Sequence, residues 1–325
     1  MNKTPFLHFP EILLAGILFS ISSPLFAELL APGDSILSRH DVNIALHIPP
    51  DLAASHGPAG ILILFGGTGD RIEYYQTAIA PLADALDLAL VIPQMQWFAT
   101  PGKDNAHVCQ ELEKVVTEIE AQFKTDPHMV IISGASAGGG IAHDLAQKWR
   151  NKTPLLVLHS TGPIADLSGP RTFHVVADKE KARLGPAGSS GVVLGRGHKD
   201  MFAVPNGEHE VHTKYMQVWL DSELAIWRLE QAQQTMDKAE EKLRKNDPTQ
   251  ALAILKSTLD SAKTMSEPVD GTDAFFQYET KHRQEIATRF APVIKKLLAL
   301  DAKITAASPS ATPAASTQPP PATTP

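Results

Sequence analysis

The chain has 325 residues and a hydrophobic fraction of 43%, enough apolar material to build one large or two modest globular domains. Its 29 Lys and Arg residues against 36 Asp and Glu residues give a formal net charge of −7. This balance, without a long basic cluster, disfavours a nucleic-acid partner or an anionic membrane surface. The single cysteine, Cys109, excludes an internal disulfide.

The first 27 residues are typical of an export signal. Lys3 precedes a mostly apolar run over residues 12–26, and Ala27 is a suitable last residue before cleavage. The run is short for a membrane-spanning helix, so a retained membrane anchor is the weaker alternative. We therefore expect a protein exported to the periplasm or the medium, without stable membrane insertion after cleavage.

From residue 42 onward, short β-like runs alternate with helical patterns, which is typical of a mostly parallel sheet covered by helices. Residues 43–48 predict an early antiparallel strand. The periodicity predicts helices over residues 71–86, broken or kinked before Pro81, and around 108–123. The further predicted strands are residues 61–65, 88–93, 129–132, 155–159, 172–177 and 191–194.

The pattern changes near residue 208, where apolar residues recur at alternating spacings of four and three up to Leu243. This stripe predicts one long helix, or two helices broken near Leu220. Further helices are expected over residues 251–265, capped by Asp247-Pro248, and over 274–300. We divide the chain into an α/β domain (28–220), a helical hairpin or bundle (221–303) and a disordered tail rich in Pro, Ala, Ser and Thr (304–325).

One motif in the sequence indicates a catalytic activity. Gly134-Ala135-Ser136-Ala137-Gly138 follows an apolar strand and leads directly into a helical stretch. Small residues in a strand–turn–helix context allow the tight turn of a nucleophile elbow, which exposes one serine hydroxyl. Ser136 is therefore the predicted nucleophile.

A serine nucleophile needs a base to take its proton and an acid to orient that base. The usual chain order for this motif is nucleophile, acid, histidine. Asp178 follows the strand at 172–177 and is preferred over Asp166 and Asp200 as the acid. His198, in a glycine-flanked loop after the strand at 191–194, is the predicted base, the alternative being a surface-loop histidine.

Two backbone amides are predicted to stabilise the developing oxyanion, those of Ala137 and of Gly67 in the glycine loop after the strand at 61–65. That loop lacks a following Gly-Lys-Ser/Thr, so it is not read as a phosphate loop, and no cofactor is expected. His209 and His212 are three residues apart but lack a third ligand, so no metal site is predicted. Candidate substrate-lining residues are Thr68, Tyr74, Tyr75, Met95, Trp97, Phe98 and His159.

Over residues 42–203 these features resemble the α/β-hydrolase family, and within it the branch of polyhydroxybutyrate depolymerases and feruloyl esterases. The resemblance rests on residues 61–68, 82–93, 134–139 and 159–163. It implies an α/β-hydrolase sandwich with Ser136, Asp178 and His198 as triad, and Gly67 and Ala137 as oxyanion donors. The branch usually has His-Gly-Cys at positions 65–67 and Trp-Pro after its catalytic histidine, so the resemblance does not establish a polymeric substrate.

The expected activity is cleavage of a small carboxylic ester through an acyl-enzyme intermediate. Two alternatives remain open. The same triad serves peptidases and amidases, and an idle hydrolase scaffold would leave the helices at 221–303 to bind a protein partner or to pack on themselves.

Overall fold

The computed structural model describes residues 30–50, 52, 60–69, 71–95, 97, 105–162, 169–184, 192–196 and 199–308. The predicted export signal lies outside these ranges, as does the predicted tail beyond Ser308. Among the helices in these ranges, none is both long and apolar enough to cross a membrane.

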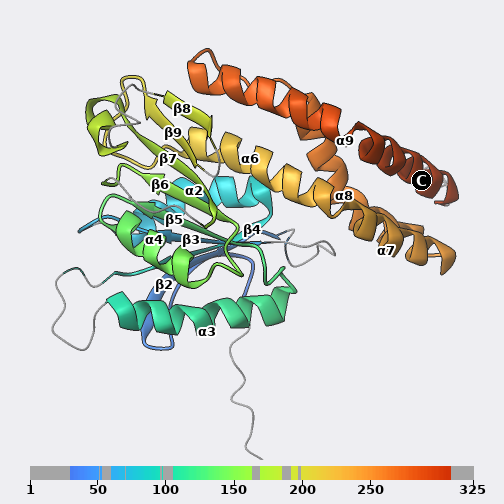
Figure 1. Cartoon of the computed structure of the whole chain (residues 1–325). Helices are drawn as coiled ribbons and strands as arrows, with labels where there is room; N and C mark the ends of the chain where they lie inside the picture. Colours follow the sequence, from blue (N-terminus) through green and yellow to red (C-terminus); the bar gives the residue numbers. More distant parts are fainter. Residues whose placement is uncertain are drawn as a thin grey trace, which may run out of the picture. The chain divides into compact units, whose positions relative to one another are not determined.

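A nine-stranded sheet forms the centre of the described chain, in the order β1-β2-β4-β3-β5-β6-β7-β9-β8 (Figure 1). Strands β3, β4, β5, β6, β7 and β9 are parallel, whereas β1, β2 and β8 pair antiparallel with their neighbours. The strands are β1 (Gly33–Arg39), β2 (Val42–Ile48), β3 (Gly60–Phe65), β4 (Leu88–Pro93), β5 (Val130–Ala135), β6 (Leu155–His159), β7 (Arg171–Ala177), β8 (Val192–Arg196) and β9 (Lys199–Val204).

Helices cover both faces of this sheet. Helix α2 (Ile72–Leu86) connects β3 to β4, α3 (Asn105–Phe123) connects β4 to β5, and α4 (Gly138–Lys148) connects β5 to β6. The chain reverses its direction across the sheet between the first two crossovers. Right-handed crossovers therefore place α2 on one face and α3 and α4 on the other. This is the three-layer α/β-hydrolase fold predicted from the sequence.

Three details differ from the sequence prediction. Helix α2 continues through Pro81 without a break, and β1 forms an additional edge strand. The strand predicted at 191–194 is β8, an antiparallel edge strand, while the strand that continues the parallel sheet is β9. Strand β9 was missed because it begins with Lys199 and Asp200, a charged pair that is atypical of a buried strand.

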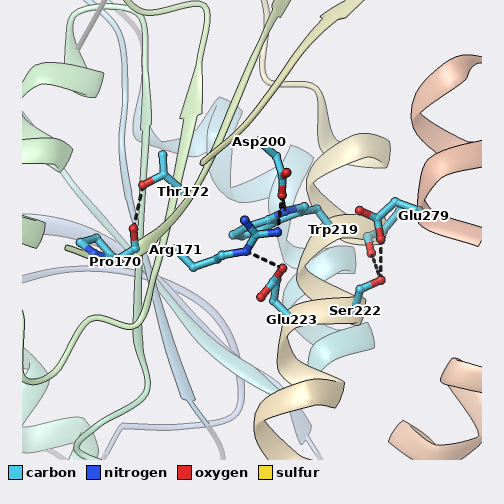
Figure 2. Close-up of polar contacts among 9 residues, drawn as sticks. Pro170, Arg171, Thr172, Asp200, Trp219, Ser222, Glu223 and Glu279 are labelled. Carbon is cyan, nitrogen blue, oxygen red and sulfur yellow. Dashed lines mark hydrogen bonds and ion pairs between the residues drawn. The ribbon is translucent and has the colours of Figure 1, made fainter. Parts of the chain in front are cut away.

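Asp200 is nevertheless fully buried (0% exposed). Its Oδ2 accepts hydrogen bonds from Arg171 Nη2 at 2.6 Å and from Trp219 Nε1 at 2.9 Å (Figure 2). Arg171 begins β7 and also donates through Nε to Glu223 at 3.0 Å. A buried carboxylate is tolerated when such charge-assisted bonds satisfy it. These contacts join β7, β9 and the helix that carries Trp219 and Glu223.

That helix is α6 (Thr213–Glu230), which is followed by α7 (Ala232–Arg244), α8 (Pro248–Ser266) and α9 (Ala274–Ala307). The break in the apolar stripe lies at Gln231 rather than near Leu220, and the predicted domain boundary at residue 220 falls inside α6. Asp247 caps α8 by accepting a hydrogen bond from Gln250 N, with Pro248 at the first helical position, as predicted. Helix α9 runs seven residues beyond its predicted end at residue 300, so residues 304–307 of the predicted tail are helical.

Two hydrophobic clusters bury the apolar stripe of these helices. The first includes α2, the sheet, the first half of α6 and the start of α9, where Phe173 of β7 stacks on Trp219 and on Phe275. The second joins the end of α6 to α7, α8 and α9. The stripe is therefore buried within a single chain, as a helical bundle continuous with the hydrolase core.

A second buried polar group links α6 to α9. Ser222 Oγ lies 2.8 Å from Glu279 Oε2 and 3.0 Å from Arg283 Nε (Figure 2). Burial raises the pKa of Glu279 to about 8, although the Ser222 hydrogen bond and the charge of Arg283 oppose this shift. A protonated Glu279 can donate a hydrogen bond to Ser222 Oγ. The Ser222 hydroxyl then donates its own hydrogen bond to Val218 O, with 3.2 Å between the two oxygens.

We predict that Asp200→Asn lowers the free energy of unfolding by about 2 kcal/mol, because Arg171 and Trp219 lose a charged acceptor in a buried setting. Urea unfolding monitored by tryptophan fluorescence measures the change. Glu241→Gln is the control, since the Glu241–Lys245 pair is solvent-exposed and such pairs contribute about 0–1 kcal/mol. Equal stability losses in the two variants would contradict this account.

Candidate active site

Ser136 occupies the turn between β5 and α4, as the motif predicts. Its φ of 51° lies in the left-handed region, which is strained for a residue with a side chain and is typical of a nucleophile elbow. The turn is held on both sides, because Ser136 N donates to His159 O at 2.8 Å and Gly139 N donates to Ser136 O at 3.2 Å. The serine side chain is half-buried at the carboxyl edge of the parallel strands.

Three glycines allow the close packing that this turn requires. A Cβ atom on Gly134 would lie 2.6 Å from Gly138 O, and one on Gly138 would overlap the carbonyl oxygens of Phe65 and Gly66. A Cβ on Gly139 would collide with the Thr161 side chain. The absence of side chains therefore brings α4 against β3 and against the chain after β6.

Ser136 lines a cavity of about 250 Å³ at this edge. The cavity gathers residues that follow β5 and β6, residues from the start of α2, and residues from the loop between β9 and α6. The lining residues are Tyr74, Tyr75, Ala135, Ser136, His159, Ser160, His209, Glu210 and Val211.

His209 is held by a carboxylate that follows β7. Its Nδ1 lies 2.8 Å from Glu180 Oε1, in the 3₁₀ helix η1 (Asp178–Leu184), and Arg183 Nε also donates to that oxygen at 3.0 Å. Burial acts to raise the pKa of Glu180, but the hydrogen bond from His209 and the charge of Arg183 outweigh it, so the pKa is lowered. Glu180 is thus ionised at neutral pH and can accept a hydrogen bond from Nδ1–H of His209, in the tautomer that leaves Nε2 as a proton acceptor.

The other two histidines at this edge are packed differently. His159 is fully buried, and its Nδ1 accepts the backbone N–H of His212 at 3.3 Å. Burial lowers the pKa of His159 well below its ordinary range, and it lowers that of His212 to about 4. Both are therefore neutral at pH 7. The side chain of His209 is 47% exposed and lies beside a carboxylate.

The predicted acid and base have different surroundings. Asp178 directly follows β7, but its side chain is 52% exposed and its nearest cation, Lys181 Nζ, is 4.0 Å away. His198 lies outside the described residues. Its described neighbours Arg196 and Lys199 pair with each other, and Lys199 pairs with Thr172 at the amino end of β7. Ser136 and Asp178 follow the carboxyl ends of β5 and β7. They therefore lie at the edge of the sheet opposite to Arg196 and Lys199.

The remaining predicted residues differ in their relation to this cavity. Ala137 is the N-cap of α4, so its amide is among those without an intrahelical partner. Gly67 is buried and its N–H donates to Tyr75 Oη at 3.0 Å. Tyr74 and His159 line the cavity, while the described residues Thr68, Met95 and Trp97 are not among its lining residues. Phe98 lies outside the described residues.

Sequence reasoning missed the Glu180–His209 pair. The available signal was the run Met201-Phe202-Ala203-Val204 followed by Pro205-Asn206-Gly207, which is a strand ended by turn residues just before His209. No spacing rule predicts the contact of Glu180 with His209, because it depends on which carboxylate the turn of η1 directs at that histidine. In the described ranges, no group of three or more His, Cys, Asp and Glu side chains is placed to hold a metal ion.

Comparison with family models agrees with this architecture. Residues 82–185, from α2 to η1, match the family model described as alpha/beta hydrolase fold, and no curated protein matches the chain in sequence. Poly(aspartic acid) hydrolase-1 from Sphingomonas sp. KT-1 is 12% identical, over 58% of this chain and 98% of that chain, with a TM-score of 0.43.

Two further solved structures are similar to the same extent. The S-formylglutathione hydrolase FrmB from Staphylococcus aureus is 12% identical, over 57% of this chain and 96% of that chain, with a TM-score of 0.44. The Francisella virulence factor BioJ is 11% identical, over 59% of this chain and 84% of that chain, also with a TM-score of 0.44. Identities this low carry no information on substrate or activity.

We predict opposite effects of alanine at two glycines of α4. Gly138→Ala places a methyl group against the carbonyls of β3 and should lower the free energy of unfolding by about 1–3 kcal/mol. Gly140→Ala meets no atom within 4 Å and should raise it by about 0.5–1 kcal/mol. Thermal unfolding of both variants measures the difference, and a stabilised Gly138→Ala would show that the elbow is not packed as described.

Proposed function

We propose that this protein is a serine hydrolase that cleaves carboxylic esters through an acyl-enzyme, with Ser136 as nucleophile, His209 as base and Glu180 as acid. One observation carries the proposal. A serine in a strained strand–helix turn shares a cavity with a histidine whose Nδ1 is bonded to an ionised carboxylate. The elements also follow the usual order of strand ends, with the nucleophile after β5, the acid after β7 and the base after the last parallel strand.

In the first step, His209 Nε2 takes the proton of Ser136 Oγ as that oxygen attacks the ester carbonyl carbon. The electron pair of the C=O π bond moves to the oxygen, where donors at the Ser136 turn stabilise it. Glu180 holds the imidazole in the correct tautomer and stabilises the imidazolium that forms. His209 then protonates the leaving alcohol, and water releases the acyl group by the same steps in reverse.

The predicted triad of Ser136, Asp178 and His198 is the alternative assignment of acid and base. Glu180 and His209 are preferred because they contact each other at the edge that carries Ser136. The cavity volume of about 250 Å³ suits a small acyl group better than a polymer segment, so we propose a small ester rather than the polyester of the depolymerase branch. A peptide or amide substrate of the same triad is the second candidate.

We further propose that the protein acts after export, in the periplasm or outside the cell, because residues 1–27 have the pattern of an export signal. Helices α6–α9 would have a scaffolding role or contact a protein partner. The packing of α6 and of the start of α9 into the same hydrophobic cluster as the sheet supports scaffolding.

We predict that Ser136→Ala lowers turnover of p-nitrophenyl acetate about 10⁴-fold or more, because the acyl-enzyme can no longer form. A fluorophosphonate probe should label the wild-type protein at Ser136 and leave the variant unlabelled. Circular dichroism should show both proteins folded alike. Near-wild-type turnover in the variant would instead favour an idle scaffold or a different active site.

The two assignments of the base and acid are separated by paired variants. His209→Ala and Glu180→Gln should each lower kcat by about 10³- to 10⁴-fold, since one removes the proton acceptor and the other leaves it misoriented. His198→Ala and Asp178→Asn should change kcat by less than about threefold, as expected for residues without a role in proton transfer. The reverse pattern would return the triad to Asp178 and His198.

A further inference from the structure

The hydrogen bond between the Gly67 amide and Tyr75 changes the expected oxyanion site. Gly67 follows β3 at the position where a backbone N–H is expected to face the reacting carbonyl. That N–H is instead directed at the hydroxyl oxygen of Tyr75, at 3.0 Å. Tyr75 is only 4% exposed and lines the cavity that contains Ser136. The amide that was expected to face the substrate is thus bonded to a phenol that lines the same cavity as Ser136.

The backbone at Gly66 leaves space for the Tyr75 ring. A Cβ atom on Gly66 would lie 2.6 Å from Cε2 of Tyr75 and 3.1 Å from its Cδ2, so the ring occupies the space that a side chain at position 66 would fill. Tyr75 projects from α2 into the main hydrophobic cluster. The Tyr74 ring packs edge-to-face against the Tyr75 ring, with 5.3 Å between the ring centroids. The hydroxyl is therefore positioned by a helix and by the end of a strand, which are rigid supports.

The chemistry of the pair favours donation by the phenol. A tyrosine hydroxyl both accepts and donates one hydrogen bond. When its oxygen accepts a bond from an amide, the O–H becomes a stronger donor, because linked hydrogen bonds polarise one another. The Gly67 hydrogen that points at Tyr75 cannot at the same time point at an oxyanion.

We propose that Tyr75 Oη–H, backed by the Gly67 amide, is the first oxyanion donor of this site, with the Ala137 amide as the second. As Ser136 Oγ bonds to the carbonyl carbon, the oxygen that gains the π electron pair accepts hydrogen bonds from the Tyr75 hydroxyl and the Ala137 N–H. No proton leaves Tyr75 in this step. The inference rests on the proposed ester hydrolysis by Ser136, and it makes Tyr75 a catalytic residue.

The test is Tyr75→Phe in the full chain, assayed on p-nitrophenyl acetate. Phenylalanine keeps the ring and removes the donor, so we expect kcat to fall about 100-fold, as for the loss of one oxyanion donor, with KM changed less than about threefold. The matched control is Tyr215→Phe, which also keeps the ring and removes a hydroxyl. The Tyr215 hydroxyl donates to Asp273 Oδ2 at 2.7 Å, and Tyr215 is not among the residues that line the cavity, so this variant should keep kcat within about twofold.

Two measurements keep the outcomes distinct. Each variant is assayed at several temperatures below its own thermal midpoint, and a kcat loss that disappears where Tyr75→Phe is fully folded would overturn the inference in favour of a packing role. Turnover above half the wild-type value in Tyr75→Phe would also overturn the role of Tyr75. In that case, labelling of Ser136 by a fluorophosphonate would still support the proposed function. Absence of both turnover and labelling in the wild type would overturn the proposed function and this inference together.

Discussion

The buried carboxylate of Asp200 is the interaction on which much of this structure depends. It lies on β9, accepts from Arg171 at the start of β7 and from the Trp219 indole on α6, and is fully excluded from solvent. An unpaired carboxylate in such a position would be strongly destabilising, so the two donors and the strand need one another. The result is a fixed register between β7 and β9 and a fixed contact of α6 with the sheet.

The position of the proposed base follows from that arrangement. With β9 parallel to β7, its carboxyl end lies beside that of β7, and the loop that leaves it carries His209 to the edge where Ser136 and Glu180 already lie. Thus a buried pair near the amino end of β7 helps to place a histidine at the opposite edge. Contact between site residues that are far apart in the chain is a consequence of parallel pairing, in which all the strand ends of one kind meet.

The C-terminal helices extend the hydrolase core. Aromatic stacking of Phe173 with Trp219 and Phe275, and the buried Ser222–Glu279–Arg283 cluster, join β7, α6 and α9 through both apolar and polar contacts. Burial keeps Glu279 largely protonated near neutral pH, so its contact with Ser222 is a hydrogen bond between neutral groups. Such contacts favour one register of α6 against α9, since a shifted register would leave them unsatisfied.

The sequence by itself determined the fold class, most of the parallel strands, the Asp247 cap of α8 and the position of Ser136. These features depend on local patterns, namely apolar runs, helical periodicity and small residues at a tight turn. The tertiary structure alone decided that the charged pair Lys199-Asp200 opens a buried strand, that Glu180 contacts His209, and that the Gly67 amide is bonded to Tyr75. Each of these depends on a partner in another element: Arg171 and Trp219 for Asp200, His209 for Glu180, and the Tyr75 ring on α2 for Gly67. A polar group reveals its role only when the partner that satisfies it is in place.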